Sequence, residues 1–256
     1  MADTFPLIDT HCHLDFPAFD ACRDEVIEEA ADLGVSTIVM PGVTAADWPR
    51  LLALQSGSRP VALGLHPCFI AQHRDQDLEL LSRLLAQERV VAVGEIGLDF
   101  FIKTLDSERQ LQLFDAQLAL AAQFDLPVLL HVRKAHDQVL QRLRQRKLPR
   151  AGIVHAFSGS EQQARQYIDL GFKLGFGGAV SYSRATKLRQ LAAQLPLEAI
   201  VLETDAPDMP LAEYPQQINR PSRVFQVAGI LAQLRGVPLQ RIAAVTTANA
   251  RQLLNI

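Results

Sequence analysis

The 256-residue chain contains little cysteine, little tryptophan and no large excess of one charge. Its three cysteines, Cys12, Cys22 and Cys68, form no CxxC pair, which excludes a disulfide framework and favours a reducing compartment such as the cytoplasm. Lysine and arginine total 25 against 28 aspartates and glutamates, so the net charge of −3 provides no general attraction for nucleic acid. A single tryptophan, Trp48, leaves few stacking surfaces of the kind that a dedicated single-strand binder uses.

Long apolar runs are also absent. The run LPVLL at 126–130 is typical, and it is far shorter than the roughly 20 residues that cross a membrane. The N-terminal stretch contains Asp3 and Asp9 but no cationic region followed by an apolar one, so it does not resemble a secretory signal. We therefore expect a cytoplasmic protein without membrane association, and the sequence indicates no obligate protein partner.

The chain does contain eight short, nearly continuous apolar runs, whose starts are spaced by about 20 to 36 residues. Continuous apolar runs are typical of parallel strands covered on both faces, and segments of helical period lie between them. The pattern predicts a single (β/α)8 TIM barrel, with residues 1–256 as one domain. The expected strands are 6–10, 35–40, 60–65, 90–95, 126–131, 152–157, 172–176 and 199–204. The expected helices are 20–33, 77–87, 107–124, 135–146, 161–170, 187–195 and a pair within 221–254.

Candidate metal ligands occur at the carboxyl ends of five of these strands. In a barrel, that end is the face at which active sites are built. Because side chains two residues apart on a strand point the same way, His11 and His13 can both face it while Cys12 points away. The candidate ligands are His11, His13, Glu95, His131, His155 and Asp205.

Four imidazoles and two carboxylates are too many ligands for one tetrahedral ion. They suit two divalent cations about 3.5 to 4 Å apart that share a carboxylate. Glu95 is the expected bridge because its strand is central in the ligand order. Zn, Mn, Ni or, in part, Mg could be accommodated. The charge of two such ions exceeds that of the two carboxylates, so the site would attract an anion although the whole chain is acidic.

Six sequence blocks resemble the signatures of the TatD-type metal-dependent hydrolases of the amidohydrolase superfamily, and they follow the family's order over nearly the whole chain. The resemblance implies a TIM barrel, two divalent ions and the same six ligands. It also implies metal-dependent phosphodiester hydrolysis, with DNase activity in some members, and a general-base role for Asp205, which with Glu95 forms the predicted catalytic pair. The blocks are IDTHCHLD (8–15), GLHP (64–67), VGEIGLDF (93–100), LLHVRKA (129–135), VHAFSGS (154–160) and LETDAP (202–207).

Four further residues are candidates for substrate binding or for support of the ligands. Arg133 is either a phosphate clamp or a surface residue in a loop. His66 could bind a substrate phosphate or orient a ligand. Asp99 could bind substrate, hold a neighbouring histidine or simply form a turn. Glu203 lies one layer below Asp205, as a support or an additional ligand.

The remaining features have weaker functional interpretations. His73 and His136 are expected at the surface, and the three cysteines are expected to be reduced packing residues. Glycines at 175–178 could let a substrate approach closely, and backbone N–H groups at 158–160 could bind phosphate.

Three functions fit the predicted site. The leading one is DNase-like hydrolysis of phosphodiesters, with DNA as a candidate substrate, through a water activated by the metals. An amidohydrolase that cleaves C–N or ester bonds of a small molecule is the nearest alternative. A non-catalytic metal-dependent binding protein is a lesser one, because the complete ligand set and a base at Asp205 favour catalysis.

Overall fold

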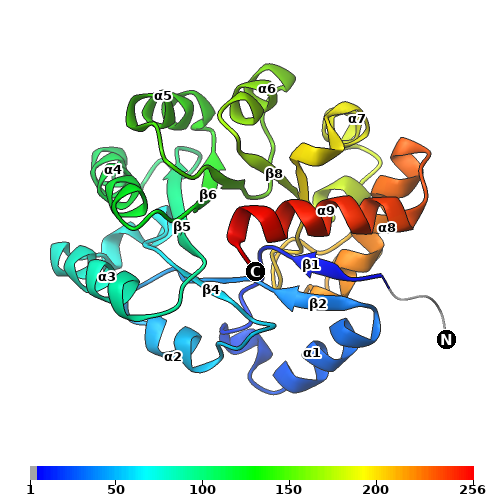
Figure 1. Ribbon diagram of the computed structural model, residues 1–256, viewed down its shortest axis with the longest axis horizontal. Helices are drawn as coiled ribbons and strands as arrows, with labels where there is room; N and C mark the ends of the chain where they lie inside the picture. The colour runs from blue at the N-terminus through cyan, green and yellow to red at the C-terminus, as the bar shows by residue number, and fades with distance from the viewer. Residues whose placement is uncertain (1–4) are drawn as a thin grey trace.

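Parallel strands form a barrel in the computed structural model, which describes residues 5–256 (Figure 1). Each of the eight expected strands is present within these residues, and the second is divided in two at Val39. The strands are β1 (Leu7–Asp9), β2 (Val35–Ile38), β3 (Met40–Pro41), β4 (Val61–Leu63), β5 (Ala92–Asp99), β6 (Val128–Arg133), β7 (Gly152–Val154), β8 (Lys173–Phe176) and β9 (Ile200–Leu202).

Backbone hydrogen bonds close the barrel between its two strand ladders. β1 pairs with β2, and β3 to β9 pair in chain order, all in parallel. The Val39 N–H donates to the Asp9 carbonyl (2.8 Å) beside the break in the second strand. The Thr10 N–H donates to the Leu202 carbonyl (2.9 Å) and so connects the first strand to the last. The predicted (β/α)8 barrel is confirmed.

Helices follow the strands and form the outer ring in Figure 1. The α2 helix was not expected because it has only six residues. It is anchored by Trp48, which is fully buried and donates from Nε1 to the Gly64 carbonyl (3.3 Å). The helices are α1 (Arg23–Asp32), α2 (Trp48–Ala53), α3 (Asp75–Gln87), α4 (Ser107–Gln123), α5 (His136–Arg146), α6 (Glu161–Asp169), α7 (Thr186–Gln194), α8 (Val224–Arg235) and α9 (Leu239–Leu254). The 3₁₀ helices are η1 (Pro17–Phe19), η2 (Pro67–Gln72), η3 (Gly178–Ser181), η4 (Leu197–Ala199) and η5 (Pro221–Arg223).

Apolar side chains fill the barrel where its strands begin. They form a separate cluster that includes Ala250 and Leu254 of α9, which lies across this end of the barrel in Figure 1. We call this cluster the floor. Because the floor closes one end, a site inside the barrel has to open at the other, where the strands end. The strand residues of the floor are Ile8, Val39, Ala62, Ala92, Leu129, Ile153 and Val201.

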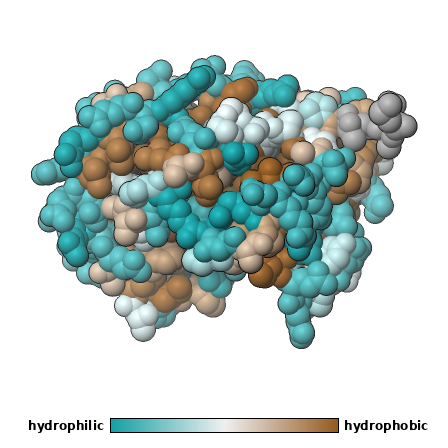
Figure 2. Space-filling model, turned by 90° about the horizontal axis from the view of Figure 1, so that it is seen from below, coloured by the Kyte–Doolittle hydropathy of each residue, from teal (hydrophilic) through white to brown (hydrophobic). Residues whose placement is uncertain are grey.

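A larger core lies between the barrel wall and the helices, and it contains the bulkiest buried side chains, Trp48, Tyr167 and Phe19 among them. On the face drawn in Figure 2, hydrophobic side chains form separate areas among hydrophilic ones. The large apolar residues exposed in the described part of the chain are Leu33, Phe101 and Ile218. None of the helices in residues 5–256 has the length and apolar character needed to cross a membrane.

Candidate metal centre

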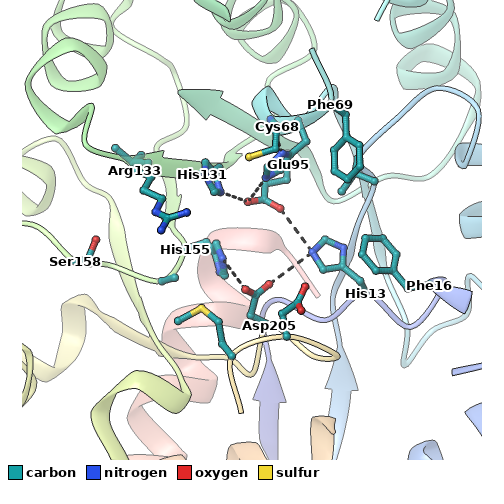
Figure 3. A pocket seen from close by; sticks show the side chains of 16 residues that line it. His13, Phe16, Cys68, Phe69, Glu95, His131, Arg133, His155, Ser158 and Asp205 are labelled. Atoms are coloured by element: carbon teal, nitrogen blue, oxygen red, sulfur yellow. Dashed lines mark hydrogen bonds and ion pairs between the residues drawn. The ribbon is translucent and has the colours of Figure 1, made fainter. Parts of the chain in front are cut away.

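A cavity of about 540 Å³ opens at the carboxyl ends of the strands (Figure 3). Five of the six expected ligands line it, and the sixth, His11, is 1% exposed and contacts Glu95 from within the barrel. The structure therefore brings the six predicted side chains together at one end of the barrel. The five that line the cavity are His13, Glu95, His131, His155 and Asp205.

Glu95 lies at the centre of the cluster and turns its two carboxylate oxygens towards different histidines. Oε2 is 3.0 Å from His11 Nε2 and 3.7 Å from His13 Nε2. Oε1 is 3.2 Å from His66 Nε2 and 3.2 Å from His131 Nδ1. The side chain is 2% exposed, so these imidazoles are its principal neighbours. This is the geometry of a carboxylate shared by two groups of nitrogen donors.

Candidate ligand atoms lie close together on the Oε2 side of Glu95. Asp205 Oδ1 lies 3.6 Å from His13 Nε2 and 3.8 Å from His11 Nε2. A tetrahedral ion with ligand bonds of about 2.0 to 2.2 Å separates its ligand atoms by about 3.3 to 3.6 Å. The four distances, 3.0 to 3.8 Å, bracket that range, and His11, His13 and Asp205 offer ligand atoms within 4.8 Å of one another, so this side of Glu95 could hold a divalent cation.

Backbone contacts between the ends of the first and last strands position His11 and Asp205. The Asp205 N–H donates to the His11 carbonyl (2.8 Å), and Asp9 Oδ1 accepts from the N–H groups of His11 (3.2 Å) and Thr204 (3.0 Å). Asp205 has a φ of 59°, in the left-handed region that non-glycine residues seldom adopt and that recurs at functional sites. Its side chain is 17% exposed, so of the two ligand carboxylates it is the more accessible from the cavity.

On the Oε1 side, His131 is held between two carboxylates. Its Nδ1 faces Glu95, and its Nε2 is 3.1 Å from Asp99 Oδ2. Asp99 is itself fixed, because its Oδ1 accepts from the N–H groups of Phe101 (2.9 Å) and Ile102 (3.2 Å). Asp99 is 1% exposed and does not line the cavity. Of the three roles considered for it, holding the histidine and forming a turn both agree with this geometry, and direct contact with a substrate in the cavity does not.

His155 has a similar arrangement on the next strand. Its Nε2 lies 3.5 Å from Asp205 Oδ2, and its Nδ1 lies 3.2 Å from Glu203 Oε1, although not in line for a hydrogen bond. Glu203 Oε1 also accepts from the Ala156 N–H (2.6 Å). A Cβ on Gly175 would lie 2.1 Å from Glu203 Oε2. The expectation that this glycine admits substrate is therefore wrong, because it makes room for Glu203.

The carboxylates of Glu95 and Asp205 are ionised because imidazoles surround them. Burial alone would raise the pKa of Glu95, but the nearby His66 and His11 hold it well below its usual range. Burial likewise opposes ionisation of Asp205, and the neighbouring His155 lowers its pKa to about 2. In return, Glu203 and Asp205 hold the pKa of His155 well above its usual value despite burial. Protons thus supply positive charge that divalent cations would replace.

The donor set fits divalent cations that bind nitrogen and oxygen, such as Zn²⁺ or Mn²⁺. The rings of His11 and His155 stack with centroids 3.7 Å apart, and those of His66 and His131 are 4.4 Å apart. Such crowding of imidazoles beside carboxylates fits a site that could hold metal ions. Each of three groups offers ligand atoms within 4.8 Å of one another. The groups are His11, His13 and Asp205; His11, Glu95 and His155; and His66, Cys68 and His131.

Arg133 and His66 both line the cavity, as candidates for substrate contact should. The Arg133 guanidinium stacks on Phe101, with Cζ 3.8 Å from the ring centroid. His66 Nδ1 accepts from the Cys68 N–H (3.0 Å), so in the neutral ring Nε2 carries the proton and donates towards Glu95. The Ser160 N–H, which was a candidate phosphate donor, instead donates to Gln163 Oε1 (2.9 Å) in the capping box at the start of α6.

Three residues differ from what the sequence indicated. Cys68 is not simply a packing residue, since it lines the cavity with Sγ 3.5 Å from Asp99 Oδ2. His73 is buried, and its Nε2 lies 2.8 Å from the His66 carbonyl. His136 is buried as well, against Tyr167. The 3₁₀ turn after β4 places Cys68 and His73, and the packing of α5 on α6 places His136. Neither feature leaves a clear periodic signal in the sequence.

Comparisons with known proteins identify the family of this chain. A family model described as TatD related DNase matches residues 8–255. The uncharacterized metal-dependent hydrolase YjjV of Escherichia coli K12 is 46% identical over 97% of this chain and 98% of its own, and its crystal structure aligns with a TM-score of 0.95 at 45% identity, covering 98% of each chain. The 3′-5′ ssDNA/RNA exonuclease TatD of Erwinia tasmaniensis is 33% identical over 98% of this chain and 100% of its own. The chain belongs to the TatD family of metal-dependent hydrolases.

Proposed function

We propose that this hydrolase cleaves phosphodiester bonds with two divalent cations that share Glu95. The observation that carries the proposal is the position of that carboxylate, with Oε2 3.0 Å from His11 Nε2 and Oε1 3.2 Å from His131 Nδ1. A carboxylate between two sets of nitrogen donors is typical of two-metal phosphatases and nucleases. The name of the Erwinia relative, an exonuclease, supports the same bond type.

Each cation would have its own ligands in addition to Glu95. Two divalent ions supply Lewis-acid stabilisation of charge on a phosphoryl oxygen and lower the pKa of an attacking water. The spacing described above supports His11, His13 and Asp205 on the Oε2 side. His131 is available on the Oε1 side through Nδ1, because Asp99 faces its other nitrogen. The sixth candidate ligand, His155, offers a ligand atom within 4.8 Å of those of His11 and Glu95, and Glu203 would be its positioning residue.

Asp205 is the group that accepts the proton of the attacking water. Its carboxylate is ionised at neutral pH, and it is more open to the cavity than Glu95, at 17% against 2% exposed. The water oxygen forms the new bond to phosphorus as the bond to the leaving oxygen breaks. The proton passes from Asp205 to the leaving oxygen, so that water and a phosphodiester give a phosphomonoester and an alcohol.

Arg133 and His66 would bind the phosphate itself. The stack on Phe101 holds the guanidinium plane of Arg133 at the cavity, where its N–H groups can form paired hydrogen bonds to two phosphate oxygens. His66 lines the same wall, and its Nε2–H group, which faces Glu95 Oε1 at 3.2 Å, would be released for phosphate when cations bind that carboxylate. Both are donors, so the substrate that they recognise should carry acceptors.

A substrate panel tests the proposal. The purified chain is stripped of metal, reloaded with Zn²⁺ or Mn²⁺, and assayed on oligonucleotides, an aryl phosphodiester, amides and lactones. We expect turnover of phosphodiesters that requires metal, with about two ions per chain. Turnover confined to amides or lactones would overturn the proposal in favour of an amidohydrolase.

Substitution of Arg133 tests the phosphate clamp. Arg133→Ala should raise KM for an oligonucleotide by about 10- to 100-fold, the scale of a hydrogen bond to a charged group. The matched control is Arg144→Ala, since Arg144 is exposed on α5 and does not line the cavity. An equal effect of the two substitutions would contradict the clamp.

A further inference from the structure

The cavity continues beyond the metal centre as two smaller hollows of about 530 and 430 Å³. The first shares Arg133 and Ser158 with the cavity, and the second shares Ser158 and Gly159 with the first. In Figure 3, Arg133 and Ser158 lie on the same side of the cavity, away from His13 and Phe16. We call the two hollows the trough. It leads from the metal centre to the start of α7.

Positive side chains predominate in the trough. Arg133 and Lys134 line its first hollow, and Arg184 and Lys187 line its second. All four are exposed, and within residues 5–256 none of them forms an ion pair. The acid that lines the trough is Asp137, whose Oδ1 accepts from Gln163 Nε2 (2.8 Å). In a chain with a net charge of −3, this local excess of cations is complementary to a polyanion.

Stacked arginine and aromatic pairs border both ends of the trough. Arg133 covers the ring of Phe101, which is 51% exposed, and Arg184 Cζ lies 4.9 Å from the centroid of Tyr182. Guanidinium planes and aromatic faces are the surfaces on which unpaired bases stack. In a duplex the bases are already stacked and paired. The two arginine–aromatic pairs of the trough therefore favour binding of a single strand over binding of a duplex.

We propose that the trough binds the part of a single-stranded polynucleotide that extends past the bond being cleaved. The inference rests on the proposed phosphodiesterase activity, because the trough is continuous with the candidate metal centre. Arg184 and Lys187 are then specificity-determining residues for strand length. A short phosphodiester that fills only the cavity gains nothing from them.

The double variant Arg184→Ala/Lys187→Ala tests this inference. Its kcat/KM for a single-stranded oligonucleotide of about 12 nucleotides should fall by about 10-fold or more through KM, and that for an aryl phosphodiester should not change. Two lost phosphate contacts should reduce the slope of log affinity against log salt by about 1.4, or 0.7 for each contact. The matched control is Arg144→Ala/Arg146→Ala, which removes the same charge from the exposed part of α5.

Each outcome supports or overturns the proposal. An unchanged oligonucleotide KM, equal losses on short and long substrates, or an equal loss in the control would overturn it. So would competition by polyaspartate as strong as that by an oligonucleotide of the same charge, since a peptide has no bases to stack. If no phosphodiester is hydrolysed at all, the proposed function fails. Fluorescence anisotropy with a labelled oligonucleotide then still tests the trough, because the double variant should bind it at least about 10-fold more weakly.

Discussion

The two ends of the barrel are built on the same strands but have opposite chemistry. At the floor, seven strand residues are small or branched and apolar, and α9 covers them. At the opposite end the same strands lead to imidazoles and carboxylates. On β6 the inward-facing side chains change from apolar to ionisable within two residues, from Leu129 in the floor to His131 in the cavity. Because the side-chain period of a strand is two, both point into the barrel.

This difference separates stability from function along the barrel axis. Apolar burial at the floor requires only volume and shape, whereas the cavity concentrates ionisable groups that need partners or cations. The floor and the larger core supply apolar burial that the crowded ionisable groups at the other end do not. Substitutions at the cavity should therefore change turnover and metal content, whereas substitutions at the floor should change the free energy of unfolding.

The largest effect is expected for Glu95→Gln. The amide keeps the shape of the side chain but removes the charge that faces both histidine pairs. Turnover of a phosphodiester should fall by about a thousandfold or more, the scale of losing a central catalytic group, and elemental analysis should find less than two ions per chain. The control is Glu108→Gln on the exposed first turn of α4, and this variant should retain both turnover and metal content. If Glu95→Gln kept its metal content and its turnover, the assignment of function to the cavity end of the barrel would be wrong.

The reverse result is expected at the floor for Leu129→Ala. Leu129 is fully buried, and truncation of a core leucine costs about 2 to 5 kcal/mol through lost burial and a cavity. Urea unfolding should measure this loss, while kcat/KM per folded molecule stays within about threefold of wild type. If turnover fell with stability, the two ends would be coupled through β6, and the separation would be wrong.

The fold and the candidate ligands were predictable for a common reason. Each strand is a continuous apolar run, so the periodicity of the sequence was sufficient to predict the strands. Each candidate ligand lies at or near the end of such a run, so its position was sufficient to select it. A barrel then brings the strand ends to one face. Glu95 at the centre of the ligand order agrees with its central position in the structure.

Other features depend on contacts between segments that the sequence does not connect. Gly175 is needed because Glu203 of the next strand fills the space above it. Cys68 reaches the cavity through the turn of η2, and Arg184 reaches the trough from the loop before α7. His136 begins α5 in a polar stretch, yet it is buried by Tyr167 of α6. Long-range packing decides each of these positions.

A smaller effect is expected at the edge of the cavity for Asp99→Asn. The carboxylate, whose own pKa is held low by His131 against the effect of burial, faces His131 Nε2 at 3.1 Å. An amide would favour the other tautomer of the ring, so the affinity for the ion on the Oε1 side should fall by about 10- to 100-fold. Titration with Zn²⁺ measures this. Asp106→Asn, at the exposed N-cap of α4, serves as control, and equal affinities in the two variants would contradict a positioning role.

The smallest effect concerns His136, which lies outside the barrel wall and lines the first hollow of the trough. It is buried between α5 and α6 beside the Tyr167 hydroxyl, and burial lowers its pKa from 6.5 to about 4. Between these values the unfolded chain binds a proton that the folded chain does not, so the contribution of His136 to stability falls as the pH falls through this window. Between pH 7 and pH 5 the loss is about 1 to 2 kcal/mol.

His136→Gln should remove that part of the pH dependence. Urea unfolding of the metal-free protein at pH 7 and pH 5 measures it as the difference between wild type and variant, so that titration of the cavity, common to both, cancels. Gln141→Ala, on the exposed part of the same helix, should behave like wild type. An identical pH dependence in wild type and His136→Gln would contradict this prediction. All the pH sensitivity of stability would then reside in the ionisable groups at the carboxyl ends of the strands, and the chemical contrast between the cavity and the floor would be sharper than the structure implies.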